Sequence, residues 1–111
     1  MANFKKLLDI KGVVLAGEFS ASGDIIAYDG LFPLEMLDDL SKICSIHNYN
    51  NKFFFNKLSI NYNIPSDFKM RTIMDICDYY LYIDSDIFLF FDKSDTVIDQ
   101  IFLLNIDDYR R

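Results

Sequence analysis

The chain has 111 residues, of which 51% are hydrophobic and 16% aromatic, and its formal net charge is −6. This length suits a single domain, and the apolar content excludes an intrinsically disordered chain. The chain has seventeen acidic and eleven basic residues. This excess of negative charge argues against nucleic acid and anionic membrane surfaces as partners, because phosphate groups bind clustered Lys and Arg. No apolar run approaches the roughly 20 residues of a membrane span, and the first residues do not resemble a signal peptide. We therefore expect a cytoplasmic protein.

The first thirty residues predict a short helix followed by a β-hairpin. Apolar residues at helical spacing favour a helix over residues 4–10. Residues 13–19 are nearly all apolar, as in a strand covered on both faces, and Gly17 within them indicates a bulge or a close backbone contact. Turn-forming residues at 20–23 precede a second strand over 24–28, so the two strands should pair.

The middle of the chain predicts one long helix over residues 34–61, because a stripe of residues recurs at intervals of three and four. Residues 47–51 have poor helix propensity, so two shorter helices are the alternative. This stripe, together with one edge of the sheet, is the predicted dimer interface, because the many aromatic residues of so short a chain favour burial by a partner. Its members are Leu37, Leu40, Cys44, His47, Asn51 and Phe54.

The last third predicts an antiparallel meander and a final helix. Three β-rich segments over 68–77, 79–83 and 87–91 are separated by Asp-containing turns. Ser94 is the expected N-cap of a helix that ends near Ile106. The element order α-β-β-α-β-β-β-α is typical of an α+β fold with helices covering one antiparallel sheet.

Segments at both ends of the chain resemble the roadblock/dynein-light-chain superfamily, most closely its small uncharacterised prokaryotic members. The matching pieces are Leu8 to Val14, Ala16 to Ser20, Gly23, Asp78-Tyr79, Ile87 to Phe91 and Asp92 to Asp95. The resemblance implies a roadblock/profilin-like fold with a five-stranded antiparallel sheet, in one domain over residues 1–111. The middle helix departs most from the superfamily pattern, at residues 47–51 and at the Phe53-Phe54-Phe55 run.

The same resemblance implies a homodimer or heterodimer that acts as a non-catalytic platform. Characterised members of the superfamily scaffold or regulate small Ras-like GTPases, or connect cargo to motors. We therefore predict a non-enzymatic, dimeric interaction or regulatory protein with a small GTPase as its partner. The alternative is a ligand-sensing or accessory subunit of a metabolic enzyme assembly, with a pocket between the sheet and the middle helix.

The chemistry-bearing residues predict no active site, cofactor or metal. Asp84-Ser85-Asp86 has the alternating carboxylates of a cation loop but lacks the further oxygen ligands and the glycine, so a solvated hairpin turn is expected. His47 and Cys44 share a helix face, yet two such residues make a weak metal or redox site. A hydrogen-bonded histidine at the interface is the preferred interpretation.

Overall fold

The computed structural model describes residues 2–31, 36–53 and 70–110, and it is built on a five-stranded antiparallel sheet of order β2-β1-β5-β4-β3. The strands are β1 (Val13–Phe19), β2 (Ile25–Gly30), β3 (Arg71–Ile76), β4 (Tyr79–Asp84) and β5 (Ile87–Asp92). The helical elements are α1 (Phe4–Leu8), α2 (Leu37–Phe53), η3 (Lys93–Asp95), α4 (Ile98–Phe102) and η4 (Ile106–Tyr109). The predicted α+β fold is confirmed.

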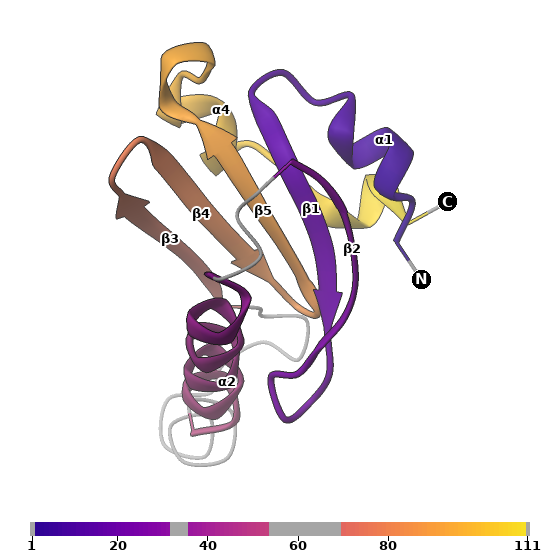
Figure 1. Ribbon diagram of the computed structural model, residues 1–111, viewed down its shortest axis with the longest axis vertical. Helices are drawn as coiled ribbons and strands as arrows, with labels where there is room; N and C mark the ends of the chain where they lie inside the picture. The colour runs from indigo at the N-terminus through magenta and orange to yellow at the C-terminus, as the bar shows by residue number, and fades with distance from the viewer. Residues whose placement is uncertain (1, 32–35, 54–69, 111) are drawn as a thin grey trace, which may run out of the picture.

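The sheet is covered on both faces and thereby separates two apolar cores. On one face α2 packs with Leu40 and Cys44 against the sheet. On the other face α1, α4 and η4 contribute Leu7, Ile101 and Ile106 to a second core. Figure 1 shows α2 in front of the sheet and the terminal segments α1 and α4 on the other side. Alternate residues of β1, β4 and β5 enter the two cores, as expected for central strands buried on both sides.

The absence of a side chain at Gly17 leaves room for an aromatic ring at the centre of the sheet. A Cβ atom at this position would lie 2.1 Å from Cζ of Phe88 on the neighbouring strand β5. The predicted close contact at Gly17 is thus confirmed. The irregularity in the pairing of β1 with β2 lies one residue further on, between Glu18 and Phe19.

The first helix and the second strand differ slightly from their predicted bounds. α1 ends at Leu8 instead of residue 10, and the chain turns there because the Asp9 N–H donates to the Lys6 carbonyl and the Ile10 N–H donates to the Leu7 carbonyl. β2 extends to Gly30 because this residue has a φ of +121° and lies against the Val14 carbonyl, where a Cβ would not fit.

The middle helix is continuous through residues 47–51, so the alternative of a break there is wrong. Tertiary contacts outweigh the poor helix propensity of this segment. The Asn48 Nδ2 donates hydrogen bonds of 3.0 Å to the carbonyls of Ser20 and Ala21, in the turn between β1 and β2. The Ser41 hydroxyl donates to the Gly23 carbonyl at 2.8 Å. Residues 34–35 and 54–61 of the predicted helix lie outside the described part of the chain.

The predicted meander is confirmed, since β3 pairs with β4 and β4 with β5, each in unbroken register. The turns fall at residues 77–78 and 85–86, where Cys77 and Ser85 both have positive φ. Residues 68–69 of the predicted third strand lie outside the described residues.

The predicted final helix is present as α4, Ile98–Phe102, but its predicted bounds from Ser94 to Ile106 are wrong. Three short helical pieces replace one long helix, because Thr96 and Val97 are extended and the Thr96 hydroxyl donates to the Asp92 carbonyl at 2.6 Å. Leu104 and Ile106 are both buried, which a straight helix would not permit for residues two positions apart. The cap of the first piece is the Asp92 side chain, which accepts from the Ser94 N–H.

We predict that Gly17→Ala lowers the free energy of unfolding by about 1–3 kcal/mol, because the added methyl group overpacks the Phe88 ring. Urea unfolding of the variant and the parent measures this difference. Ile26→Ala, at an exposed position of β2, serves as the control and should change the midpoint little. An unfolding midpoint of Gly17→Ala equal to that of the parent would contradict the packing described here.

Candidate functional site

The inner side of α2 packs against the sheet of its own chain. Leu40, Cys44 and His47 lie on this side, and all three are buried. The helix stripe that the sequence assigns to a dimer interface is therefore largely used within the protomer. Leu37 packs at the edge of the same core, and Asn51 is half-buried. Phe54 lies outside the described residues.

His47 connects α2 to the outermost strand of the sheet. Its Nδ1 forms a 2.7 Å hydrogen bond with the hydroxyl of Thr72 in β3, and its ring meets the Phe19 ring edge-on. Its Nε2 is buried and has no hydrogen-bond partner among the described residues, and the same is true of the Asn51 Oδ1. The hydrogen-bonded histidine expected from the sequence is present, although its partner belongs to the same chain.

Burial keeps both chemistry-bearing side chains of α2 in their neutral forms. Desolvation lowers the pKa of His47, and the charge of Asp84 offsets this only in part. Burial raises the pKa of Cys44 to about 12, so its thiol is protonated and a poor nucleophile or metal ligand at neutral pH. Within the described ranges, no group of three or more His, Cys, Asp or Glu residues is placed to hold a metal ion.

The outer side of α2 carries a second apolar stripe that the prediction did not single out. Ile46, Tyr49 and Phe53 follow one another at helical spacing, and 59%, 70% and 49% of their surfaces are exposed. The signal was present in the sequence as a second set of apolar residues on the helix. Spacing alone does not show which of two stripes faces the core.

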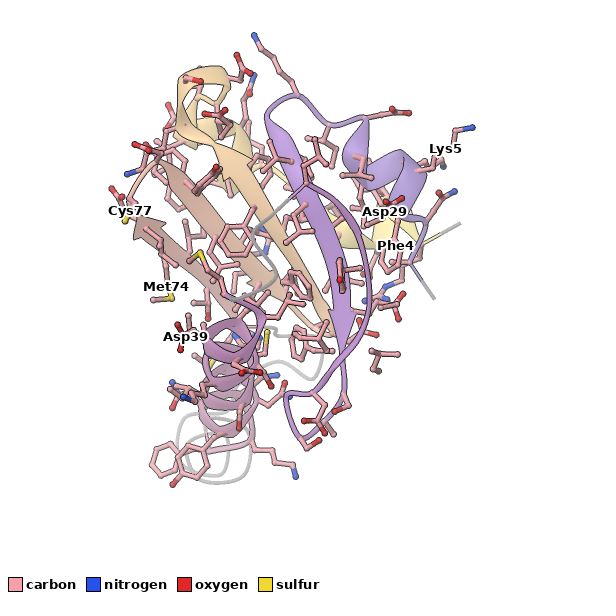
Figure 2. All side chains as sticks on the ribbon, viewed as in Figure 1. Phe4, Lys5, Asp29, Asp39, Met74 and Cys77 are labelled. Carbon is pink, nitrogen blue, oxygen red and sulfur yellow. The ribbon has the colours of Figure 1, made fainter. Side chains whose placement is uncertain are left out.

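This outer stripe lies beside an open edge of the sheet. β3 pairs only with β4 among the described strands, and its side chains are exposed or half-buried. Ile46 of α2 and Met74 of β3 line the same small cavity between the two elements. Figure 2 shows Met74 at this edge of the sheet, next to α2. We call the four residues Ile46, Tyr49, Phe53 and Met74 the α2–β3 surface.

The opposite edge of the sheet differs in its backbone. β2 also exposes apolar side chains, with Ile26 the most exposed within the strand. However, the pairing of β1 with β2 shifts register between Glu18 and Phe19, whereas β3 is regular along its whole length. Bulges increase local twist and hinder the addition of a further strand, so β3 is the more suitable edge for a partner.

The hairpin turn expected at Asp84-Ser85-Asp86 is present, but Asp84 is buried and not solvated as the sequence predicted. Asp84 is 2% exposed and accepts hydrogen bonds from Tyr82 and Ser85. Asp86 pairs with Arg110, with 2.9 Å between Oδ1 and Nη2. The turn is ordered by these partners, because a buried carboxylate needs hydrogen bonds and opposite charge nearby.

A sequence profile of the family described as "Uncharacterized conserved protein (DUF2173)" matches residues 3–104. A search of curated proteins gave no significant match. Among solved structures, the Roadblock/LC7 domain from Streptomyces avermitilis is similar, with a TM-score of 0.55 at 10% identity over 89% of this chain and 82% of that one. The gliding protein MglB from Thermus thermophilus has a TM-score of 0.56 at 16% identity, over 90% and 75% of the two chains. The chain thus has a roadblock-like fold.

Within the residues described, no helix is long and apolar enough to cross a membrane.

We predict that acidification destabilises the protein through His47, the single histidine of the chain. Its folded pKa lies below the value of about 6.5 in an unfolded chain. As the pH falls through 6.5, the unfolded chain therefore binds a proton that the folded protein resists, and stability is lost until the folded pKa is reached. Urea unfolding of the parent and of His47→Gln between pH 7.5 and 5 tests this. The parent should lose more stability than the variant, and parallel losses would contradict the account.

Proposed function

The chain belongs to the DUF2173 family of conserved proteins, and we propose that it is a non-enzymatic, dimeric interaction protein. Two copies contact each other through the α2–β3 surface. The dimer then serves as a platform for a protein partner, in the cytoplasm. The exposed apolar stripe of α2 beside the open edge of β3 is the observation that carries this proposal.

The α2–β3 surface has the composition of an interface. Single exposed apolar side chains are common, but a row of them at helical spacing beside an unpaired strand marks a contact surface. Tyr49 and Phe53 are aromatic residues of the kind enriched where proteins meet. Covering them removes apolar area from water, and covering β3 satisfies backbone groups that otherwise bind water.

A two-fold axis beside β3 places the α2 stripe of one protomer against that of its partner. Such an interface is self-complementary, because each residue of the stripe meets the same surface on the other copy. In this arrangement Leu40, Cys44 and His47 act indirectly, by fixing α2 on its sheet. A contact of Leu37, Asn51 or Phe54 with the partner stays a prediction.

A small Ras-like GTPase is the proposed partner of the dimer. This choice rests on the resemblance to the roadblock superfamily, whose members regulate or scaffold such GTPases. A platform of this kind acts by binding one nucleotide state of the GTPase more tightly than the other, which shifts the equilibrium between them. It needs no catalytic group of its own, and the buried, neutral Cys44 and His47 are consistent with such a role.

The alternative function, a ligand sensor with a pocket between α2 and the sheet, has less support at that position. The cavity lined by Ile46, His47 and Met74 measures about 120 Å³. Sites for small molecules usually enclose about 300–1,000 Å³. No observation at this place favours a metabolite over the dimer.

We predict that Ile46→Asp converts the dimer to a monomer of 13.0 kDa, because a carboxylate without a partner would be buried at the centre of the contact. Light scattering at micromolar concentration measures the mass. Ile26→Asp introduces the same charge at a similarly exposed residue on the opposite edge, and should leave the dimer intact. A monomeric parent protein, or equal effects of the two variants, would contradict the assignment of the α2–β3 surface.

We also predict that the dimer binds a purified Ras-like GTPase from the same organism in one nucleotide state, with at least tenfold weaker binding to the other. Calorimetric titration with the GDP-loaded GTPase, and with the GTPase bound to a non-hydrolysable GTP analogue, measures both affinities. Failure of every such GTPase to bind in either state would remove the GTPase role and leave the dimer untouched.

A further inference from the structure

A cavity lies on the sheet face opposite α2, between the first residue of β3 and the segment that follows α4. Its volume is about 570 Å³, within the range of small-molecule sites. It is lined by Arg71, Asp84, Phe102, Leu103, Leu104, Asn105 and Asp107. The cavity exists because α4 ends at Phe102 and a short non-helical segment leads to η4, instead of the helix continuing over this part of the sheet.

A buried carboxylate positions the Arg71 side chain in this cavity. The Arg71 Nε lies 3.4 Å from Oδ2 of Asp84, and Nη1 donates to the Phe102 carbonyl at 3.2 Å. Asp84 is itself fixed by the Tyr82 hydroxyl, which donates to the same Oδ2 at 2.9 Å. Holding a long side chain in one orientation in this way reduces the entropy lost when it binds a ligand.

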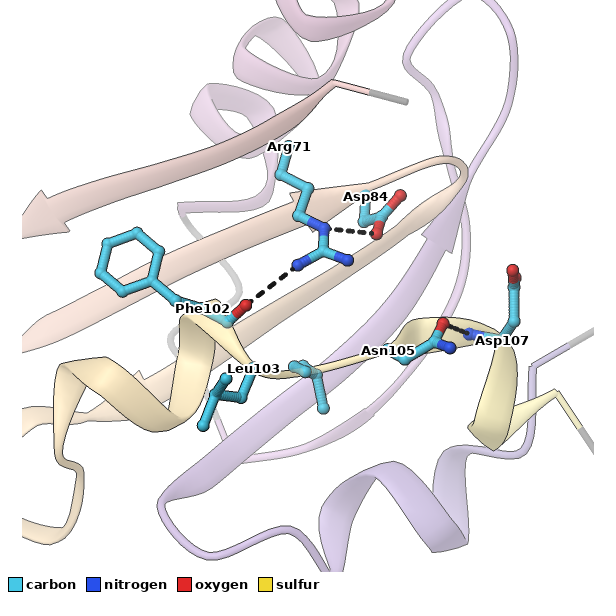
Figure 3. A pocket seen from close by; sticks show the side chains of 7 residues that line it. Arg71, Asp84, Phe102, Leu103, Asn105 and Asp107 are labelled. Atoms are coloured by element: carbon cyan, nitrogen blue, oxygen red, sulfur yellow. Dashed lines mark hydrogen bonds and ion pairs between the residues drawn. The ribbon is translucent and has the colours of Figure 1, made fainter. Parts of the chain in front are cut away.

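The guanidinium group of Arg71 has N–H donors that its contacts with Asp84 and Phe102 do not use, and these can bind a ligand. Arginine carries five N–H groups, and the two contacts above use two of them. Nη2 has no hydrogen-bond partner among the described residues, and Figure 3 draws no interaction to it. About 40% of the Arg71 side chain is exposed, so these donors remain accessible from the cavity. A planar pair of oxygens is the acceptor that matches such a fork.

The remaining walls combine apolar surface with one amide. Phe102 and Leu103 are exposed large apolar residues that line the cavity. The Asn105 Oδ1 accepts from the Asp107 N–H at 3.2 Å, which leaves its NH₂ group as a further donor. The Asp107 carboxylate pairs with Arg110 Nε at 3.1 Å, which offsets its charge at the rim.

We propose that this cavity binds a small carboxylate with a short aliphatic chain. The carboxylate pairs with the free edge of the Arg71 guanidinium, and the chain lies against Phe102 and Leu103. Because the net charge of the protein is −6, long-range attraction does not assist an anion, so the affinity of a minimal ligand is in the millimolar range. The site lies on the other face of the sheet from the α2–β3 surface, although Arg71 belongs to the same edge strand β3.

The probe for this site is butyrate, with butyramide as its neutral analogue. Nuclear magnetic resonance of the full-length, isotope-labelled protein follows the backbone amides at constant ionic strength, up to about 50 mM ligand, since millimolar binding is worth only about 4 kcal/mol. Butyrate should produce saturable shifts centred on Arg71 and residues 102–105, at an affinity about fivefold higher than that of butyramide. Acetate should bind more weakly than butyrate, by roughly two- to fourfold per methylene group. Equal binding of butyramide, or the absence of saturable shifts, would overturn the proposal.

Two variants and one matched control localise the binding. Asn105→Asp keeps an oxygen that accepts from the Asp107 N–H but places a negative charge at the rim, so butyrate affinity should fall at least fivefold. Asn50→Asp adds the same charge on an exposed residue of α2 and should leave the affinity unchanged. Arg71→Lys retains the charge next to Asp84 but removes the planar fork, and should also weaken butyrate binding. Equal effects of Asn105→Asp and Asn50→Asp would show general charge repulsion and would overturn the site.

Discussion

The pairing of β1 with β5 is the contact on which the rest of this structure depends. It joins the N-terminal hairpin to the C-terminal meander, whose strands lie about seventy residues apart in the chain. Closing so long a loop costs entropy, and burial of both strands on both faces offsets that cost. The absence of a side chain at Gly17 allows the Phe88 ring to fill the centre of the contact. Without this pairing, neither α2 nor the terminal helices would have a common sheet to cover.

Because helices cover both faces of the sheet, its edges and the outer side of α2 are the surfaces that remain for partners. The two sides of α2 then have different tasks. The inner side holds the helix on the sheet, and the hydrogen bond from His47 to Thr72 ties it to the edge strand β3. The outer side carries Ile46, Tyr49 and Phe53 and stays exposed. The position of the proposed interface therefore follows from intrachain packing, because His47 and its neighbours determine which side of the helix faces away.

Much of the fold is predictable from the sequence because its strands carry strong local signals. Apolar runs such as residues 87–91, separated by Asp-containing turns, predict strands and their antiparallel pairing. The continuity of α2 is less predictable, because the hydrogen bonds of Asn48 to the distant β1–β2 turn stabilise a segment of low propensity. The C-terminal segment is predicted wrongly for a similar reason, since Leu104 and Ile106 both reach the core only if the helix breaks.

The candidate site is less predictable than the fold. Helical spacing identifies an apolar stripe on the middle helix, but burial shows that Leu40 and Cys44 face the chain's own sheet. The burial of Asp84 likewise depends on Tyr82 and Arg71, whose proximity appears only once the strands are paired. In both cases the burial depends on contacts between different strands or layers, and local sequence does not encode such contacts.

Two copies of this chain are proposed to meet along β3 and the outer side of α2. Backbone amide hydrogen exchange, measured at protein concentrations above and below the dimer dissociation constant, tests this contact most directly. Amides of β3 should become protected as the concentration rises, while those of the other edge strand, β2, should not change. Protection of β2 with concentration, or β3 amides that exchange equally fast at every concentration, would contradict the proposed contact.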